Sequence, residues 1–143
     1  LKALPAVMDE YIGLMREGLR SGMSQPKVIL SGREVPIRKQ LVETPELSDF
    51  YKPFLKIDER IEPGAQKQLA SEAASAVMEG VVPAYQRLYD FFVDEYFTKA
   101  RTTLGAKHLP NGEKFYQEQI YLPEHHAILR VEVLVFLCCL QKG

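Results

Sequence analysis

Histidines are the residues of this sequence most suited to bind a metal ion or to act as a catalytic base, and their spacing argues against a metal centre. A helical zinc site of the HExxH type needs two histidines four residues apart, so that both imidazoles point to one side of the helix. His125 and His126 are adjacent, and the residues four positions after them are Leu129 and Arg130. Adjacent side chains lie about 100° apart around a helix, so this pair cannot jointly hold one ion from that helix. We therefore assign no metal-binding residue.

The third histidine and the serines lack the neighbours that nucleophilic catalysis needs. His108 precedes a turn and has no cysteine or serine nucleophile at a recognisable spacing. Ser71 and Ser75 lie in "ASEAASAV", which lacks the glycine-flanked elbow of a hydrolase nucleophile and is typical of a helix contact. No glycine-rich phosphate loop is present in the sequence. The sequence thus predicts no catalytic residue, no cofactor-binding residue and no cofactor.

Three carboxylates fall within about one turn of a predicted helix, namely Asp90, Asp94 and Glu95. The same helix bears Tyr85, Tyr89 and Tyr96. A buried pair of carboxylates can perform acid and base chemistry. Arg87 and Lys99 stand at helical spacing from the three carboxylates and can screen them. The pattern therefore favours a solvated face over a catalytic pair.

Charge and composition exclude several classes of function. The 143 residues include 18 basic and 19 acidic side chains, which are scattered and give a net charge of −1. Without a basic block to neutralise phosphates, nucleic acid is not an expected partner. The adjacent Cys138 and Cys139 cannot easily form a relaxed disulfide. The longest uncharged apolar run, 133 to 140, is far shorter than the roughly 20 residues of a membrane-spanning helix, so no transmembrane span is expected.

The first part of the chain has the three-and-four apolar spacing of helices. One helix is predicted over residues 5 to 21, with Pro5 in its first turn and Gly22 closing it in the left-handed conformation. A bent element should follow from about 25 to 42, capped by Ser24 and broken where Gly32 and Pro36 stand four residues apart. The apolar residues assigned to one face of the first helix are Leu4, Val7, Met8, Tyr11, Leu14, Met15 and Leu19.

The middle of the chain predicts an extended connection and then a long helix. Pro45, Pro53 and Pro63 mark the connection from 43 to 63. Its residues Phe50, Tyr51, Phe54 and Leu55 are expected to pin it to the core. Two amphipathic runs between 64 and 104 can form one helix kinked near Pro83 and ended by Gly105. The first run has a face of small side chains for close packing, composed of Ala65, Leu69, Ala73, Ala76, Val77 and Gly80.

The last part predicts a turn at 109 to 112, a short helix at 113 to 121 and a final apolar element from Pro123, for which helix and strand both remain open. The expected fold class is thus all-α, with several amphipathic helices and a long helix kinked near Pro83. We expect residues 1 to 143 to form a single helical domain that is part of a larger helical protein.

Four phrases, in this order, resemble the domain-of-unknown-function 885 family of bacterial proteins. They are "REGLRSGMSQPKVIL" (16 to 30), "FYKPF" (50 to 54), "VPAYQRLYDFFVDEYFTKAR" (82 to 101) and "LPNGEKFY" (109 to 116). The resemblance covers most of residues 10 to 121. The segment "PEHHAILRVEV" (123 to 133) is an altered version of the family's next helix start, and "LVFLCCLQKG" departs from its pattern.

The resemblance implies a large helical protein similar to HExxH-type zinc peptidases, whose metal motif lies downstream of the matched region. It implies a peptide as substrate and the bacterial envelope as location, because members of the family are often lipoproteins. On this hypothesis the chain is a helical scaffold that forms one wall of a substrate cleft. The alternative is a stand-alone helical binding or assembly module, a homodimer through the apolar C-terminal segment from Val131 to Leu140.

Overall fold

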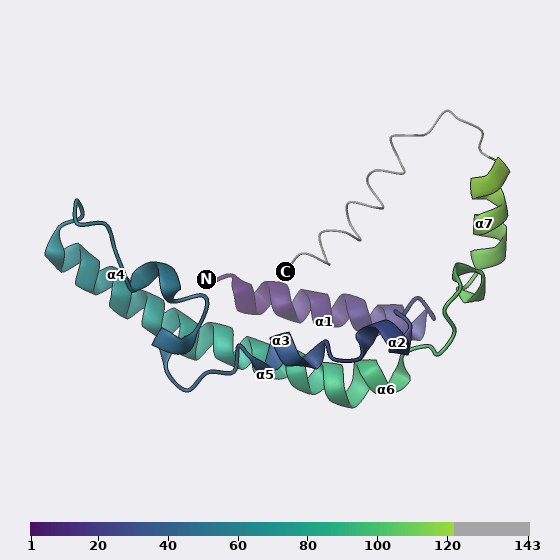
Figure 1. Cartoon of the computed structure of the whole chain (residues 1–143), viewed down its shortest axis with the longest axis horizontal. Helices are drawn as coiled ribbons and strands as arrows, with labels where there is room; N and C mark the ends of the chain where they lie inside the picture. Colours follow the sequence, from purple (N-terminus) through teal and green to yellow (C-terminus); the bar gives the residue numbers. More distant parts are fainter. Residues whose placement is uncertain (122–143) are drawn as a thin grey trace. The chain divides into compact units, whose positions relative to one another are not determined.

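The structure, a computed structural model, describes residues 1–121 (Figure 1). The chain divides into two compact units, Leu1–Thr103 and Leu104–Gly143. Every regular element within residues 1–121 is helical, so the predicted all-α class is confirmed. The predicted strand or helix from Pro123 onward, like the His125 and His126 pair, lies outside the described residues. The single-domain expectation stays a prediction.

The first helix, α1, spans Leu4–Arg20, within one residue of the predicted bounds at each end. Pro5 stands in its first turn, as predicted, where its missing N–H costs no hydrogen bond. Gly22 has φ 75°, in the left-handed region that glycine adopts without strain. The chain turns there, and the Met23 N–H donates to the Gly18 carbonyl at 2.7 Å. The predicted start and stop signals of this helix are therefore confirmed.

The predicted bent element is two short helices, α2 (Lys27–Leu30) and α3 (Glu34–Arg38). The break falls at Gly32, as predicted: Ser31 leaves the helical conformation with ψ 127°, and Gly32, with φ 81°, completes the turn that separates the two helices. The prediction that Ser24 caps this element was wrong, because Pro26 is the N-cap residue and makes no side-chain cap. Ser24 is buried instead, and its hydroxyl accepts a hydrogen bond from the Arg101 N–H at 3.1 Å. The serine thus joins distant segments of the unit.

The connection from 43 to 62 contains two 3₁₀ turns, η1 (Pro45–Leu47) and η2 (Lys52–Phe54). Tyr51 is buried, and Phe50 and Phe54 pack against the same cluster, as predicted. The prediction for Leu55 was wrong, since this side chain is 57% exposed. It lies just after η2, where the chain turns away from the cluster that the three aromatic rings fill.

One continuous helix of 37 residues, Pro63–Lys99, is the longest element of the first unit (Figure 1). It consists of α4 (Pro63–Ser75), η3 (Ala76–Val81), α5 (Val82–Asp90), η4 (Phe91–Tyr96) and α6 (Phe97–Lys99). The Glu62 carboxylate caps its start by accepting hydrogen bonds from the N–H groups of Gly64 and Ala65. The two predicted runs are therefore a single helix.

Its irregularities are π-helical turns at η3 and η4. A proline inside an α-helix lacks its N–H and its ring clashes with the carbonyl four residues back. In η3 the Val82 N–H donates to the Val77 carbonyl, five residues back, and this wider turn directly precedes Pro83. The irregularity predicted near Pro83 thus takes the form of a π-helical turn that carries the helix through the proline.

The prediction that Gly105 ends this helix was wrong, because the helix ends at Lys99. Ala100 is buried in extended conformation, with φ −61° and ψ 146°. Beyond it the Arg101 carbonyl accepts a hydrogen bond from the Lys27 N–H at 2.8 Å. Tertiary hydrogen bonds to Ser24 and to Lys27, the first residue of α2, therefore take the backbone out of the helix before the glycine is reached.

Two apolar clusters hold the first unit together. The first joins Ile12 of α1 and Leu30 of α2 to the long helix through Phe91, Phe92, Tyr96 and Ala100. The second joins Tyr51 of the connection to Ala73 and Val77. Both clusters include residues of a π-helical turn, Val77 from η3 and the three aromatic residues from η4. Helix α1 lies along η3, α5 and η4 of the long helix, and α4 extends beyond the start of α1 (Figure 1).

The second unit, as far as it is described, contains η5 (Ala106–His108) and α7 (Gly112–Tyr121). The turn between them is the one predicted at 109 to 112, where the Gly112 N–H donates to the Leu109 carbonyl at 2.8 Å. Asn111 has φ 56°, which asparagine tolerates better than most residues. The predicted turn and short helix are confirmed.

Candidate functional site

The two serines considered as nucleophiles lie on the exposed side of the long helix. Ser71 and Ser75 line an open groove of about 390 Å³ together with Lys2, Glu72, Ala76, Glu79 and Gly80. The Lys2 ammonium lies 3.8 Å from the Glu72 carboxylate. None of the lining residues within 1–121 is a histidine, so no imidazole of this part of the chain lies beside the hydroxyls as a base. The groove offers hydrogen bonds to a ligand and no activated nucleophile.

Gly80 at the edge of this groove has a packing role. A Cβ added there would lie 3.5 Å from Cγ of Pro5, so the missing side chain lets α1 begin close against η3. Ala73 and Val77 of the predicted small-residue face are buried, whereas Leu69 is 42% exposed. The small side chains therefore serve close helix packing, as predicted for this face, over its second half.

The three carboxylates on the long helix form a solvated face, as the spacing predicted. Asp90 and Asp94 are exposed and Glu95 is half-buried. The Asp90 carboxylate accepts a hydrogen bond from the Gln86 amide at 2.8 Å. A hydrogen bond from Arg16 holds the pKa of Glu95 below its ordinary value, and the charges of Arg16 and Lys99 add to this effect. An acid catalyst at neutral pH needs a raised pKa, so this group is not suited to that role.

Of the two basic partners predicted for these carboxylates, one is confirmed and the other was wrong. Lys99 lies 3.7 Å from Glu95, as expected. The prediction for Arg87 was wrong, because its guanidinium forms two hydrogen bonds of 2.9 Å with the Asp9 carboxylate on α1. The prediction failed because helical spacing identifies only those neighbours of a side chain that lie on the same helix. The side chain instead links the long helix to α1, and Arg16 does the same in the other direction through Glu95.

Arg16 also contacts the aromatic core from its exposed side. Its guanidinium carbon lies 4.9 Å from the ring centre of Phe91, within reach of a cation–π interaction.

Two tyrosines of the long helix also make structural contacts. The Tyr96 hydroxyl accepts a hydrogen bond from the Gln25 N–H at 3.3 Å. Burial raises the pKa of Tyr85, whose ring centre lies 5.7 Å from that of Phe50. These contacts hold elements together and bring no reactive groups into one place.

His108 is exposed at the end of η5. Close to it in the second unit is an open groove of about 440 Å³. Its lining is Lys107, Leu109, Asn111, Gly112, Glu113, Lys114 and Gln117, without a cysteine or serine. The structure therefore brings no nucleophile to the histidine within the described part of this unit.

A zinc ion does not fit the side chains of residues 1–121, because no group of three or more histidine, cysteine or acidic side chains there is placed to hold a metal. None of the helices in the same range is long and apolar enough to cross a membrane.

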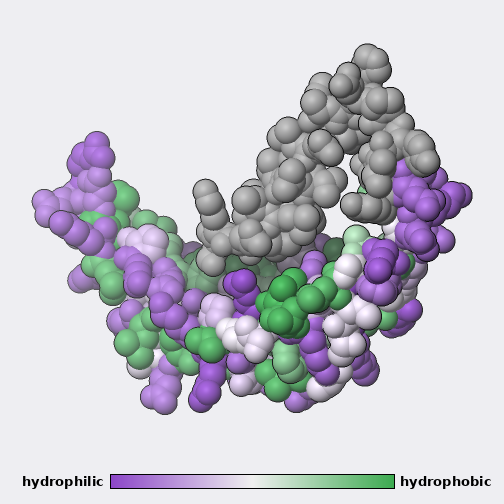
Figure 2. Space-filling model, turned by 45° about the vertical axis from the view of Figure 1, so that its right-hand side comes forward, coloured by the Kyte–Doolittle hydropathy of each residue, from purple (hydrophilic) through white to green (hydrophobic). Residues whose placement is uncertain are grey.

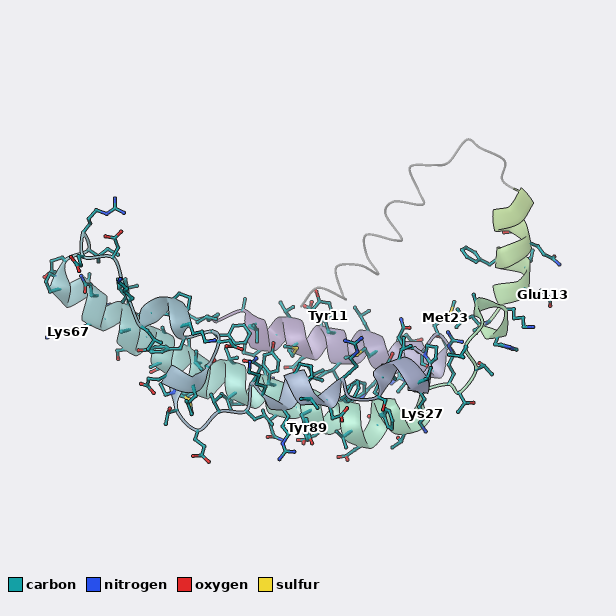
Figure 3. The ribbon with its side chains drawn as sticks, viewed as in Figure 1. Tyr11, Met23, Lys27, Lys67, Tyr89 and Glu113 are labelled. Carbon is teal, nitrogen blue, oxygen red and sulfur yellow. The ribbon has the colours of Figure 1, made fainter. Side chains whose placement is uncertain are left out.

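The outer side of α1 carries exposed apolar residues, which the sequence pattern did not distinguish from the residues that pack against the long helix. Val7, Tyr11 and Leu14 were assigned to the face that packs, and they are 42%, 57% and 68% exposed. Figure 3 shows Tyr11 on the side of α1 that points away from the long helix. Apolar side chains also gather in patches among polar ones on the face drawn in Figure 2. The row of Val7, Tyr11 and Leu14 is called the outer row below.

A signal for the outer row was present in the sequence. The apolar positions from Leu4 to Leu19 cover an arc of roughly 150° or more around the helix, wider than one neighbour needs. A helix with so wide an arc has apolar surface for two neighbours. The structure supplies one of them, since Ile12, Met15 and Leu19 pack on the long helix.

Comparison with known families assigns the chain. Residues 1–126 match the model of a family described as bacterial protein of unknown function, DUF885. This chain belongs to the DUF885 family. The match includes α1 to α7 and all four phrases that carry the resemblance. Comparisons with curated proteins and with solved structures found no match.

Proposed function

We propose that this DUF885 chain is the helical scaffold of a metallopeptidase-like protein and forms one wall of its substrate cleft. The observation that carries the proposal is the outer row of α1. A helix that is already packed on one side and still presents three large apolar side chains on the other is suited to support further protein structure.

The long helix supports this role by its construction. Two ion pairs tie it to α1, one between Arg87 and Asp9 and one between Arg16 and Glu95. The aromatic residues of η4 fill the space between the two helices. A support of this kind holds its exposed side chains in fixed positions, which a substrate wall requires. No step of the peptidase reaction is assigned to residues 1–121, since their side chains do not fit a zinc ion.

A measurement of bound zinc tests the proposal. The 143-residue chain and the complete product of its gene are purified without chelator, and zinc is measured by mass spectrometry alongside hydrolysis of a labelled casein. We expect zinc and chelator-sensitive hydrolysis in the gene product, and no specific zinc binding by the 143-residue chain in calorimetry. A gene product without zinc, or a stoichiometric zinc site in the chain that His125→Ala removes, overturns the proposal.

The second candidate function is an assembly module that forms a homodimer. The run of apolar residues in the sequence from Val131 to Leu140 favours it, because apolar surface is often covered by a second copy. Light scattering after size exclusion separates the two candidates. A monomer at micromolar concentration excludes the dimer, and a dimer that the substitution Val135→Asp dissociates supports assembly through the C-terminal segment.

A further inference from the structure

We infer that the outer row of α1 is a docking surface for an amphipathic helix whose apolar ridge is bordered by basic side chains. This inference goes beyond the proposed function, because it names the chemistry of the partner and holds whether or not the protein carries zinc. It depends on two observations, the geometry of the row and the charges along its edge.

The geometry is that of a helix that receives another helix. Val7, Tyr11 and Leu14 follow the i, i+4, i+7 spacing that places side chains on one line of a helix. The row is about 10 Å long at 1.5 Å per residue, which corresponds to two turns of a partner helix. Ala3, which is small and exposed, precedes the row on the same side, so a second helix can approach from that end. At the other end the Met23 backbone lies against Gly18, where a Cβ would be 3.6 Å from the Met23 carbonyl oxygen, and this turn limits the row.

The charge at the edge of the row is negative. Glu10 and Glu17 each follow a residue of the row by three positions, so both lie about 60° to the same side of it. Both are exposed. Glu17 is paired with Arg20 of its own helix at 3.0 Å, and Glu10 forms no ion pair within residues 1–121. The opposite edge of the row is apolar and leads into the core through Met15. The charge that this surface offers to a partner is therefore the Glu10 carboxylate, supported by Glu17.

This charge distribution disfavours a second copy as the occupant. In an antiparallel pair of α1 helices related by a two-fold axis, the same edge of each helix meets its own copy. Glu10, near the middle of the row, would then lie close to Glu10 of the other copy, and this contact between like charges destabilises the pair. A helix with lysine or arginine along one edge meets the carboxylates with the opposite sign. Charge complementarity therefore selects a basic-edged helix.

Two matched peptides test this with the full 143-residue chain. The first is a labelled helical peptide of about 18 residues with a leucine ridge and lysines along its edges, and the second has glutamate in place of every lysine. Binding is followed by fluorescence anisotropy at low and at physiological ionic strength. We expect the lysine peptide to bind about ten-fold more tightly than its glutamate twin, with a difference that shrinks as salt is added.

Variants of the chain locate the site. Leu14→Asn should weaken binding of the lysine peptide by about ten-fold, since it places an amide in the centre of the apolar contact. The double substitution Glu10→Lys with Glu17→Lys should reverse the preference so that the glutamate peptide binds better. Val28→Asn on α2 is the matched control, because Val28 is also exposed, at 63%, and lies on another helix. It should leave both affinities unchanged.

The outcomes decide the inference in either direction. Equal binding of the two peptides, no binding of either, or an effect of Val28→Asn as large as that of Leu14→Asn overturns it. A dimer in light scattering that Leu14→Asn converts to monomer also overturns it, because a second copy then covers the row. The zinc measurement of the proposed function is unaffected by any of these results, so the two proposals fail separately. Circular dichroism of each variant confirms that these exposed substitutions leave the helices formed.

Discussion

Helix α1 has two apolar sides, and the structure treats them differently. The inner side places Ile12 at 6% exposure against Phe91 and Phe92 of the long helix, with Met15 and Leu19 packed beside it. On the outer side, by contrast, Leu14 is 68% exposed. Both sides consist of the same kinds of residue at the same spacing. The difference in exposure between the two sides therefore comes from the position of the long helix and not from the residues of α1.

The comparison shows what hydrophobic periodicity reports. The pattern shows that a stretch of chain is helical and that part of its circumference is apolar. It does not show how many neighbours share that circumference. A partner that covers only part of a wide apolar arc leaves the remainder as a surface for binding. On α1 that remainder is the outer row.

The largest expected difference in stability is that between two truncations, one on each side of α1. Ile12→Ala should lower the free energy of unfolding by about 2 to 5 kcal/mol, because it removes buried methylene groups and leaves a cavity beside the η4 rings. Leu14→Ala should change it by less than about 0.5 kcal/mol, since its side chain is mostly in water. Urea denaturation of both variants measures the difference. Similar losses for the two would show that the outer row is covered in solution.

The sequence predicted most of the helical elements because their signals are local. Pro5 and Gly22 bound α1 through their own backbone properties, and Gly32 breaks the next element for the same reason. The failures are those places where a distant segment decides. The long helix ends at Lys99 because the backbone groups of Arg101 bond to Ser24 and to Lys27 at the start of α2. No local pattern predicts a contact between residues about 75 positions apart.

The site predictions separate in the same way. The solvated carboxylates followed from helical spacing, and the exposed positions of Asp90 and Asp94 confirm them. The partner of Arg87 was missed because Asp9 lies on another helix, 78 residues away in the sequence. The sequence pattern predicts one packing face for α1, whereas the structure divides the arc of apolar residues into a packed side and the outer row. The width of the arc is the feature of the sequence that indicates two sides.

A glycine substitution tests whether the remaining circumference of α1 is free. Gly13 lies on the solvent side of the helix, and a Cβ built there would meet nothing within 4 Å. Gly13→Ala should therefore stabilise the chain by roughly 0.4 to 1 kcal/mol, because alanine loses less backbone entropy in a helix. Thermal unfolding by circular dichroism measures the shift. A destabilising result would mean that another segment packs over this position in solution.

The ion pair that joins the two helices should contribute little. Arg87 and Asp9 have side chains that are 46% and 54% exposed, and exposed pairs are worth about 0.2 to 1 kcal/mol, so the bidentate geometry of this pair places it toward the upper end of that range. A double-mutant cycle with Asp9→Ala and Arg87→Ala isolates the coupling between them. The coupling should fall as salt is added. A coupling above the range for exposed pairs would show that the inner side of α1 depends on this pair as much as on its apolar contacts.

The smallest effect concerns pH and the Arg16–Glu95 pair. Hydrogen bonding from Arg16 lowers the pKa of Glu95 in the folded chain below the ordinary value of 4.5. As the pH falls below about 4.5, the unfolded chain takes up this proton before the folded chain does, so the stability contributed by the pair is present above that pH and is lost below it.

Asp49, held by Lys52, and Asp58, held by Arg60, also have lowered pKa values and lose stabilisation in the same acidic direction. The contribution of Glu95 must therefore be isolated by comparing the native chain with Glu95→Gln by urea denaturation from neutral to acidic pH. The difference in unfolding midpoint should be small at neutral pH and should shrink toward zero in acid, as the native carboxylate becomes protonated. If the difference stays constant across this range, the charge of Glu95 does not stabilise the inner side of α1, and the apolar contacts of Ile12 alone distinguish it from the outer row.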